Sequence, residues 1–416
     1  MSFLKKIKLP GWIFIGLGLG IIAGIIFALT GNGGETAITT TYIKPFGTIY
    51  INLLKFLVVP VVMTSIVSGV VSLGDVKRVG SIGWKTIVYY MVTTVIAIII
   101  GLLFANIARA LNWFPTLETS GLEYEANSSN VMDVIVNIFP SNMWGAFSNA
   151  SMLQVIVIAL FFGVGILMAG EKAKAFDDFM TSAYEVVMKI MNMVIALTPI
   201  GVFCLITDTV AVNGAAILGS LAIVIGVAYV AYIVHFLLCY GLSATLLSKI
   251  GFGKFVKGIL PAMVVSFTTT SSAATLPVTT ECSNNMGADP EISSFVLPLG
   301  ATINMDGTAI YQGVAAIFIA TCYGVSLDLG QMLMIVLTTV LASIGTAGTS
   351  GAGMIMLAMV LEQVGLPVEG IALIAGVDKL FDMGRTTLNI VGDSTCALYM
   401  SRLDARRAAK KAAKAQ

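Results

Sequence analysis

The sequence predicts an all-α polytopic membrane protein, and two observations support this. First, 57% of the residues are hydrophobic and 11% are charged, with a mean hydropathy of +0.95, whereas soluble domains have about 25% charged residues. Second, apolar stretches long enough to cross a bilayer, about 20 residues, recur along the chain. The net charge of +1 indicates no nucleic-acid partner. The five cysteines show neither a CxxC motif nor the spacing of metal ligands.

Eight apolar stretches have spanning length. They cover residues 11–30, 43–73, 84–110, 150–169, 178–212, 216–247, 292–324 and 367–400. The first is too long for a signal-peptide core, so we expect it to be a mature transmembrane helix. Joins on the N-terminal side are rich in Lys and Arg and the opposite joins are acidic, so the positive-inside rule predicts cytoplasmic termini. The basic tail 402–416 is expected to continue the last helix.

Two further apolar segments are too short to cross. Residues 254–268 run into the polar tract 266–272, and residues 331–344 run into the Ser-, Thr- and Gly-rich tract 343–353. A break at membrane depth leaves backbone groups unpaired, which is tolerated only inside protein or beside a watery cavity. We therefore expect two re-entrant hairpins that enter from opposite sides, each followed by a long helix. Inverted repeats of interrupted helices are typical of secondary transporters.

The last apolar stretch carries a polar stripe. Asp378, Asp382, Arg385, Asn389 and Asp393 fall within about 80° of one another on a helix. Charges at mid-membrane cost about 2.5–3.5 kcal/mol each on insertion scales, so the stripe must face protein, ions or a ligand. For one isolated pair of opposite charges, a structural ion-pair network would be an adequate explanation. Three carboxylates facing one arginine favour a ligand or ion site instead.

Hard oxygen ligands of the kind that an alkali cation accepts gather near the stripe. The sequence GATINMDGT at 300–308 interrupts the seventh stretch and is interpreted as an unwound segment with freed carbonyls. The candidate ligands are the backbone oxygens near Gly300, Thr302 and Asn304 and the carboxylates of Asp306 and Asp393. His235 is the only histidine, and we expect it to have a packing role rather than to bind metal.

Anionic substrate groups have two kinds of expected partner. Arg385 offers a planar fork that suits a carboxylate in a way that lysine would not. The two hairpin tips offer hydroxyls, backbone amides and half-helix N-termini. An intramembrane aspartyl protease is excluded because Asp382 and Asp393, eleven residues apart on one helix, are separated by about 16 Å and cannot share a proton.

Four motifs resemble the signatures of the dicarboxylate/amino acid:cation symporter family, the glutamate transporters and their prokaryotic homologues. They are SSAATLPVT (271–279), PLGATINMDGTAIYQG (298–313), SIGTAGTSGAG (343–353) and DMGRTTLNIVGDS (382–394). The upstream half agrees through LLKFLVVPVVMTSIVSGV (53–70), VYYMVTT (88–94) and ALTPIGVF (196–203). The resemblance therefore covers nearly the whole chain.

The resemblance implies a substrate site. In the family, the residue matching Arg385 grips the side-chain carboxylate of the substrate and the one matching Asp382 holds its α-amino group. The residues implied to complete the pocket are Ser271, Ser272, Thr308, Thr386 and Asn389, with Thr349 and Gly353 of the second hairpin.

The resemblance also implies sodium sites for co-transported Na⁺. One would use Gly300, Asn304, Asn389 and Asp393. A second would use backbone oxygens of Thr302, Ser343, Ile344 and Thr346, and a third would use Tyr90, Thr93, Thr94, Asn304 and Asp306.

The chain departs from the family beside Asp382. Members usually place an arginine there, at the position of Thr270 or of Met383, and this chain has it at neither. We therefore expect Asp382 to lack a nearby cation, with its charged form disfavoured by burial and by the other carboxylates. Gln312 stands where animal members carry a glutamate linked to proton coupling, which argues against that proton route.

The expected function is sodium-coupled import of aspartate or glutamate without enzymatic turnover. By resemblance the protein is a homotrimer in the plasma membrane that works by an alternating-access elevator mechanism. The expected parts are a scaffold (1–81 and 113–212), a transport domain (82–112 and 213–401) and the tail (402–416).

The alternatives are a proton- or sodium-coupled symporter of C4-dicarboxylates or of neutral amino acids, and an ion channel. A dicarboxylate carrier would not need Asp382, and a neutral amino-acid carrier would not need Arg385. The presence of both residues favours an acidic amino acid as the substrate.

Overall fold

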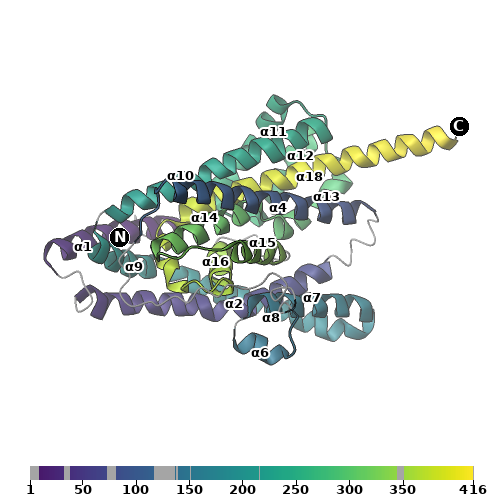
Figure 1. The fold of residues 1–416 in the computed structure, drawn as a ribbon. Helices are drawn as coiled ribbons and strands as arrows, with labels where there is room; N and C mark the ends of the chain where they lie inside the picture. The colour runs from purple at the N-terminus through teal and green to yellow at the C-terminus, as the bar shows by residue number, and fades with distance from the viewer. Residues whose placement is uncertain are drawn as a thin grey trace, which may run out of the picture.

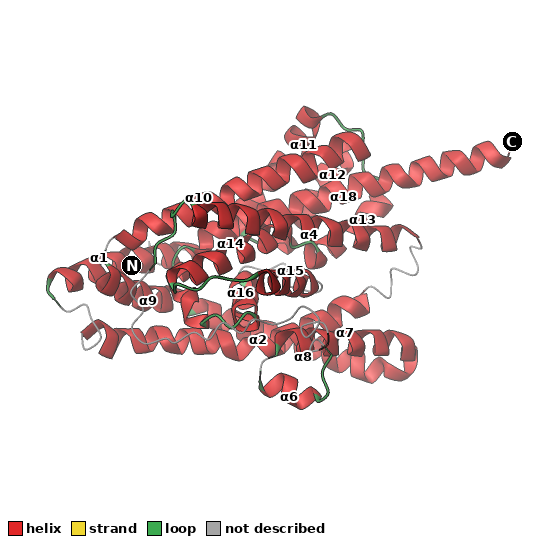
Figure 2. Ribbon diagram, in the orientation of Figure 1, coloured by secondary structure: helices red, strands yellow, loops and turns green. Residues whose placement is uncertain are grey.

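The computed structural model describes residues 9–31, 38–72, 81–116, 136, 139–149, 151–214, 216–343 and 351–415. Within these residues all regular structure is helical (Figure 2). The first part of the chain forms α1 (Leu9–Leu29), the π-helical turn η2 (Thr39–Ile43), α2 (Lys44–Ser72), α4 (Ser81–Ala110), α6 (Met143–Ser148), α7 (Met152–Ala169), the 3₁₀ turn η4 (Gly170–Ala173), α8 (Lys174–Ala196), α9 (Thr198–Asn213) and α10 (Ala216–His235).

The second part begins with two π-helical turns, η5 (Phe236–Gly241) and η6 (Ser243–Leu247). It continues with α11 (Phe252–Thr269), α12 (Ser272–Met286), α13 (Pro290–Ile303), α14 (Asp306–Cys322), α15 (Leu329–Ser343), α16 (Ala352–Gln363), the 3₁₀ turn η7 (Val368–Gly370), α17 (Ile371–Ala375) and α18 (Asp378–Ala415). The last helix runs past the other helices to the C-terminus (Figure 1). The tail therefore continues the last helix, as predicted.

Six helical stretches of the described chain are long and apolar enough to cross a membrane. They are Gly11–Leu29, Thr39–Val71, Ile82–Ala110, Gln154–Ala196, Leu218–Leu247 and Pro290–Cys322. On α1, Leu19, Ile22 and Ile26 are each more than half exposed, which in a soluble protein would be an unusual apolar face. The helices and their exposed apolar faces are those of a polytopic membrane protein.

The predicted span 178–212 differs from the structure because α8 and α9 meet at Leu197. Pro199 lies in the first turn of α9, and proline cannot donate the backbone hydrogen bond that a continuous helix would need. The predicted span 367–400 is likewise divided into η7, α17 and α18. The polar stripe therefore begins at the first turn of a new helix, at Asp378.

The break in the first predicted hairpin is shorter than the polar tract suggested. Only Thr270 and Ser271 lie outside helices, between α11 and α12, which pack against each other. Ser266, Thr268 and Thr269 are helical, and their hydroxyls are satisfied within α11 by donating to carbonyls three or four residues earlier. Thr270 ends α11 in the left-handed conformation, with φ of +52°.

The seventh stretch is interrupted as predicted, but the break is shorter than the expected segment 300–308, and the carbonyl of Gly300 is not free because it accepts from Asn304 N. Helix α13 ends at Ile303, Asn304 and Met305 are non-helical, and α14 begins at Asp306. Helix α14 is buried along nearly its whole length and packs against α4, α10, α16 and α18. The second predicted hairpin is described only in its two arms, α15 and α16, which lie side by side (Figure 1). Its tip, residues 344–350, lies outside the described residues.

Candidate substrate and cation site

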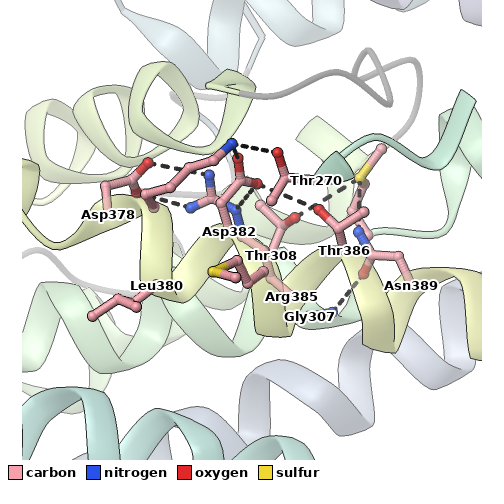
Figure 3. Close-up of polar contacts among 12 residues, drawn as sticks. Thr270, Gly307, Thr308, Asp378, Leu380, Asp382, Arg385, Thr386 and Asn389 are labelled. Atoms are coloured by element: carbon pink, nitrogen blue, oxygen red, sulfur yellow. Dashed lines mark hydrogen bonds and ion pairs between the residues drawn. The ribbon is translucent and has the colours of Figure 1, made fainter. Parts of the chain in front are cut away.

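Three members of the polar stripe form one ion-paired group on α18 (Figure 3). Arg385 donates from Nη1 to Asp378 Oδ1 at 2.9 Å and from Nη2 to Asp378 Oδ2 at 3.3 Å. Its Nε donates to Asp382 Oδ1 at 3.0 Å. All three side chains are buried, so their charges must be compensated by groups inside the protein rather than by bulk water.

Residues on two other helices also lie against the guanidinium of Arg385. Its Cζ lies 4.7 Å from the centre of the Tyr311 ring, a cation–π contact from α14. On α16, a Cβ added to Gly353 would lie 2.4 Å from Arg385 Cζ, so only glycine leaves room for the guanidinium. Sequence reasoning predicted Gly353 at the site and did not find Tyr311.

The tip of the first hairpin reaches the start of α18 through Thr270, whose hydroxyl accepts a hydrogen bond from Lys379. Ser271 caps α12 by accepting a hydrogen bond from Ala274 N at 3.2 Å, and Ser272 is buried beside it. Thr386 donates to Asp382 Oδ1 at 3.3 Å. Thr308 is buried at the start of α14.

The expectation that Asp382 lacks a nearby cation is wrong. Lys379 Nζ lies 3.5 Å from Asp382 Oδ2, and the same ammonium donates a short hydrogen bond to Thr270 Oγ1. Lys379 was not assigned to the stripe because it follows Asp378 and points about 100° away on a helical wheel. Its long side chain nevertheless reaches Asp382, and its hydrogen-bond partner comes from another element.

The helix break at Asn304 is tied to α18 by a second polar group. Asn304 Nδ2 donates to Asn389 O and to Asp393 Oδ1, both at 2.9 Å. Asn389 Oδ1 accepts from Gly307 N at 2.7 Å. At Gly300, an added Cβ would lie 2.4 Å from Asp393 Oδ1. The structure therefore brings together all four residues expected for the first sodium site.

One acceptor in this group is unused. Asn304 Oδ1 is buried and has no hydrogen-bond partner among the described residues. A buried oxygen without a partner is costly, and it lies on a side chain that already holds Asp393. An alkali cation would satisfy this oxygen. Within the described chain, no three His, Cys, Asp or Glu side chains gather as they would for a transition metal.

Of the residues expected to join Asp306 in the third sodium site, Thr94 contacts its carboxylate directly. Thr94 donates to Asp306 Oδ1 at 2.7 Å, and the Thr93 and Thr94 hydroxyls also donate to Tyr90 O. The other carboxylate oxygen, Oδ2, accepts from Tyr240 at 2.6 Å and lies 3.1 Å from His235 Nε2. Tyr240 was not predicted at the site. His235 was expected to have a packing role rather than to bind metal, and it is buried beside Asp306.

The residues expected for the second sodium site are only partly described. Thr302 and Ser343 each donate from their hydroxyl to a carbonyl three residues earlier. Ile344, Thr346 and the substrate-site residue Thr349 lie outside the described residues. The second sodium site therefore remains an expectation of the resemblance.

A sequence profile of the sodium:dicarboxylate symporter family matches residues 9–403. The chain belongs to this family. A proton/sodium-glutamate symport protein of Geobacillus stearothermophilus is 36% identical over 408 residues, which are 96% of this chain and 95% of that protein. A proton/glutamate-aspartate symporter of Escherichia coli (strain K12) is 33% identical, over 98% of this chain and 95% of its own.

Another relative carries a different substrate name. A C4-dicarboxylate transport protein of Bacillus subtilis (strain 168) is 31% identical over 92% of this chain and 90% of its own. The family predicted from the four motifs is therefore confirmed. These relatives are named as transporters rather than enzymes, and this agrees with a multi-pass membrane chain.

Proposed function

We propose that this chain is a sodium-coupled symporter that imports acidic amino acids, L-aspartate or L-glutamate. The observation that carries the proposal is the buried pair Arg385 and Asp382, whose Nε and Oδ1 atoms lie 3.0 Å apart. A guanidinium fork suits a carboxylate and a carboxylate suits an ammonium group. An acidic amino acid offers both partners, which supports it over a substrate with only one.

Sodium coupling is supported by the oxygen-rich group at the helix break. Asp393 contributes a buried carboxylate, Asn304 contributes an unused carbonyl oxygen, and Gly300 allows the two helices to approach closely. Oxygen ligands without imidazole or thiolate favour a hard cation. The cation is cargo in this proposal and moves with the substrate.

We also propose the finer architecture of the family for this chain: eight crossings, two re-entrant hairpins, cytoplasmic termini and a homotrimer in the plasma membrane. In this arrangement a transport domain formed by residues 82–112 and 213–401 moves against a scaffold formed by residues 1–81 and 113–212. The described substrate-site residues lie within the proposed transport domain, since Asp382 and Arg385 come from α18 and Thr308 from α14.

A C4-dicarboxylate is the second candidate substrate. Lys379 places a second buried cation near Arg385, and one relative is named for C4-dicarboxylates. Proton coupling is the corresponding alternative for the driving ion, since two of the relatives carry a proton in their names.

Calorimetry on the purified protein tests the proposal. We expect aspartate or glutamate to bind in NaCl and not in KCl at matched ionic strength, and alanine to bind at least about a hundredfold more weakly, since it lacks the charged group that Arg385 recognises. Equal aspartate binding in both salts would contradict sodium coupling. Alanine binding as tightly as aspartate would contradict the substrate class.

A further inference from the structure

Lys379 is a buried lysine inside the candidate substrate site. Its side chain is 8% exposed, its ammonium lies 3.5 Å from Asp382 Oδ2, and it donates to the hydroxyl of Thr270 at the tip of the first hairpin. Lysine is rarely buried unless it is paired, because its charge loses solvation. The pairing with Asp382 explains why it is tolerated here.

The two oxygens of Asp382 have different partners. Oδ1 accepts from Arg385 Nε and from Thr386, whereas Oδ2 faces Lys379. Oδ2 is therefore the oxygen at which a second ammonium group would meet the ammonium of Lys379. Like charges that share one carboxylate repel each other, and a carboxylate left without a cation in a buried site is costly.

We propose that Lys379 sets the selectivity between dicarboxylates that carry an amino group and dicarboxylates that lack one. The inference rests on the proposed function, in which Asp382 faces the amino group of the substrate. A substrate with an amino group brings its own cation to Asp382 and competes with Lys379 there. A substrate without one leaves Asp382 with only the two cations of the protein, Lys379 at Oδ2 and Arg385 at Oδ1.

The charges of the group give the direction of the effect. Asp378 and Asp382 are balanced by Lys379 and Arg385, so these four side chains sum to zero. Without Lys379 the group has one surplus negative charge. That surplus repels succinate, which has two negative charges, more strongly than it repels aspartate. The ammonium group of aspartate can also contact Oδ2 of Asp382 without competition from Lys379. Loss of Lys379 therefore shifts selectivity toward aspartate.

Thr270 provides a second contact for the ammonium of Lys379. It is buried, with 1% of its surface exposed, and its hydroxyl bonds the lysine from a left-handed backbone position. Figure 3 shows Thr270 facing Asp382. Removing the hydroxyl while keeping the shape of the side chain would loosen the lysine without removing its charge. The selectivity change should then have the same direction as in Lys379→Met and be smaller.

The experiment measures the affinities of aspartate and succinate on the same purified protein in saturating NaCl at pH 8. The variants are Lys379→Met, Lys379→Arg and Thr270→Val. Lys257→Met is the matched control, because it removes a lysine charge from the exposed face of α11. The result is the ratio of the succinate dissociation constant to the aspartate dissociation constant. Because both ligands are measured on one preparation, a loss of active protein affects both dissociation constants equally and does not change their ratio.

We expect Lys379→Met to raise the ratio by at least about tenfold, Thr270→Val by about two- to fivefold, and Lys379→Arg and Lys257→Met to leave it within about twofold of wild type. An unchanged or lowered ratio in Lys379→Met overturns the inference. An equal rise in Lys257→Met does so too, because the effect would then be one of net charge.

The same data separate this inference from the proposed function. If the wild-type protein prefers succinate to aspartate, the proposed substrate is wrong, while a rise of the ratio in Lys379→Met still supports the role of Lys379. If the wild-type protein prefers aspartate and the ratio does not change, the proposed function stands and the inference fails. If Lys379→Met does not fold, the ratio of dissociation constants measured for Thr270→Val decides instead. A Thr270→Val ratio within error of wild type then overturns the inference.

Discussion

Asn304 donates its side-chain amide to Asp393 at 2.9 Å and so joins the break between α13 and α14 to the middle of α18. The same amide reaches Asn389 O. The contact fixes the carbonyl oxygen of Asn304, which has no partner among the described residues. This geometry relates the proposed sodium site to the stripe that carries the proposed substrate site.

Asp393→Asn tests that relationship. Removing the carboxylate charge should raise the sodium concentration needed for half-maximal aspartate binding by at least about tenfold, because a hard cation loses its anionic ligand. The affinity for aspartate at saturating sodium should change less. A sodium titration of aspartate binding measures both quantities. Thr395→Val is the control, since among the described residues the Thr395 hydroxyl donates to the backbone of its own helix. An unaltered sodium requirement would rule out Asp393 as a ligand.

Arg385→Cys should lower aspartate affinity by at least about a hundredfold, since hydrogen bonds between charged groups contribute about 1.5–3 kcal/mol each. Small neutral amino acids such as serine should retain binding, because they do not need the guanidinium. Arg385→Lys keeps the charge without the fork and should recover only part of the loss. Competition binding measures the series, and wild-type aspartate affinity in Arg385→Cys would refute the assignment.

Gly353→Ala should weaken aspartate binding by about tenfold or more, because the new methyl group would occupy space 2.4 Å from Arg385 Cζ. The matched control is Gly226→Ala on α10, where an added Cβ has no heavy atom within 4 Å. That change should leave binding unaltered. Equal effects of the two substitutions would show that the displacement of Arg385 is not the cause.

Lys55 and Glu369 link the two proposed domains. Lys55 Nζ on α2 donates to Glu369 Oε1 in η7 at 2.8 Å.

A cross-link between Lys55→Cys and Glu369→Cys tests domain movement. The variant needs a background without the native cysteines. If α2 and η7 move relative to each other during transport, complete cross-linking should reduce uptake by about tenfold or more while aspartate affinity stays within about threefold. Full uptake by the cross-linked protein would contradict movement between these two parts.

Much of the fold could be predicted from the sequence because its signals are local. Apolar length predicted most of the long apolar helices, although the predicted spans 178–212 and 367–400 are divided. The motif around Asn304 and Asp306 predicted the break between α13 and α14. The first hairpin break was predicted too long, because Ser and Thr hydroxyls can bond to their own helix backbone, as those of Ser266 and Thr268 do. A polar side chain on its own does not identify a non-helical residue.

Contacts between distant segments were harder to predict. Periodicity grouped Asp378, Asp382 and Arg385 because they share a face, and it omitted Lys379 because that residue leaves the helix on another side. The Lys379 partner Thr270 lies 109 positions away in sequence. Tyr240 reaches Asp306 from η5, and nothing in the local sequence pattern indicates that contact.

Uptake into proteoliposomes tests the central claim most directly. Vesicles containing the purified protein should accumulate radiolabelled aspartate or glutamate when a sodium gradient points inward and the pH is equal on both sides. A tenfold sodium gradient supplies about 1.4 kcal/mol for each ion that moves with the substrate. Accumulation should disappear when potassium replaces external sodium. Accumulation that an imposed pH gradient drives without sodium would contradict the account.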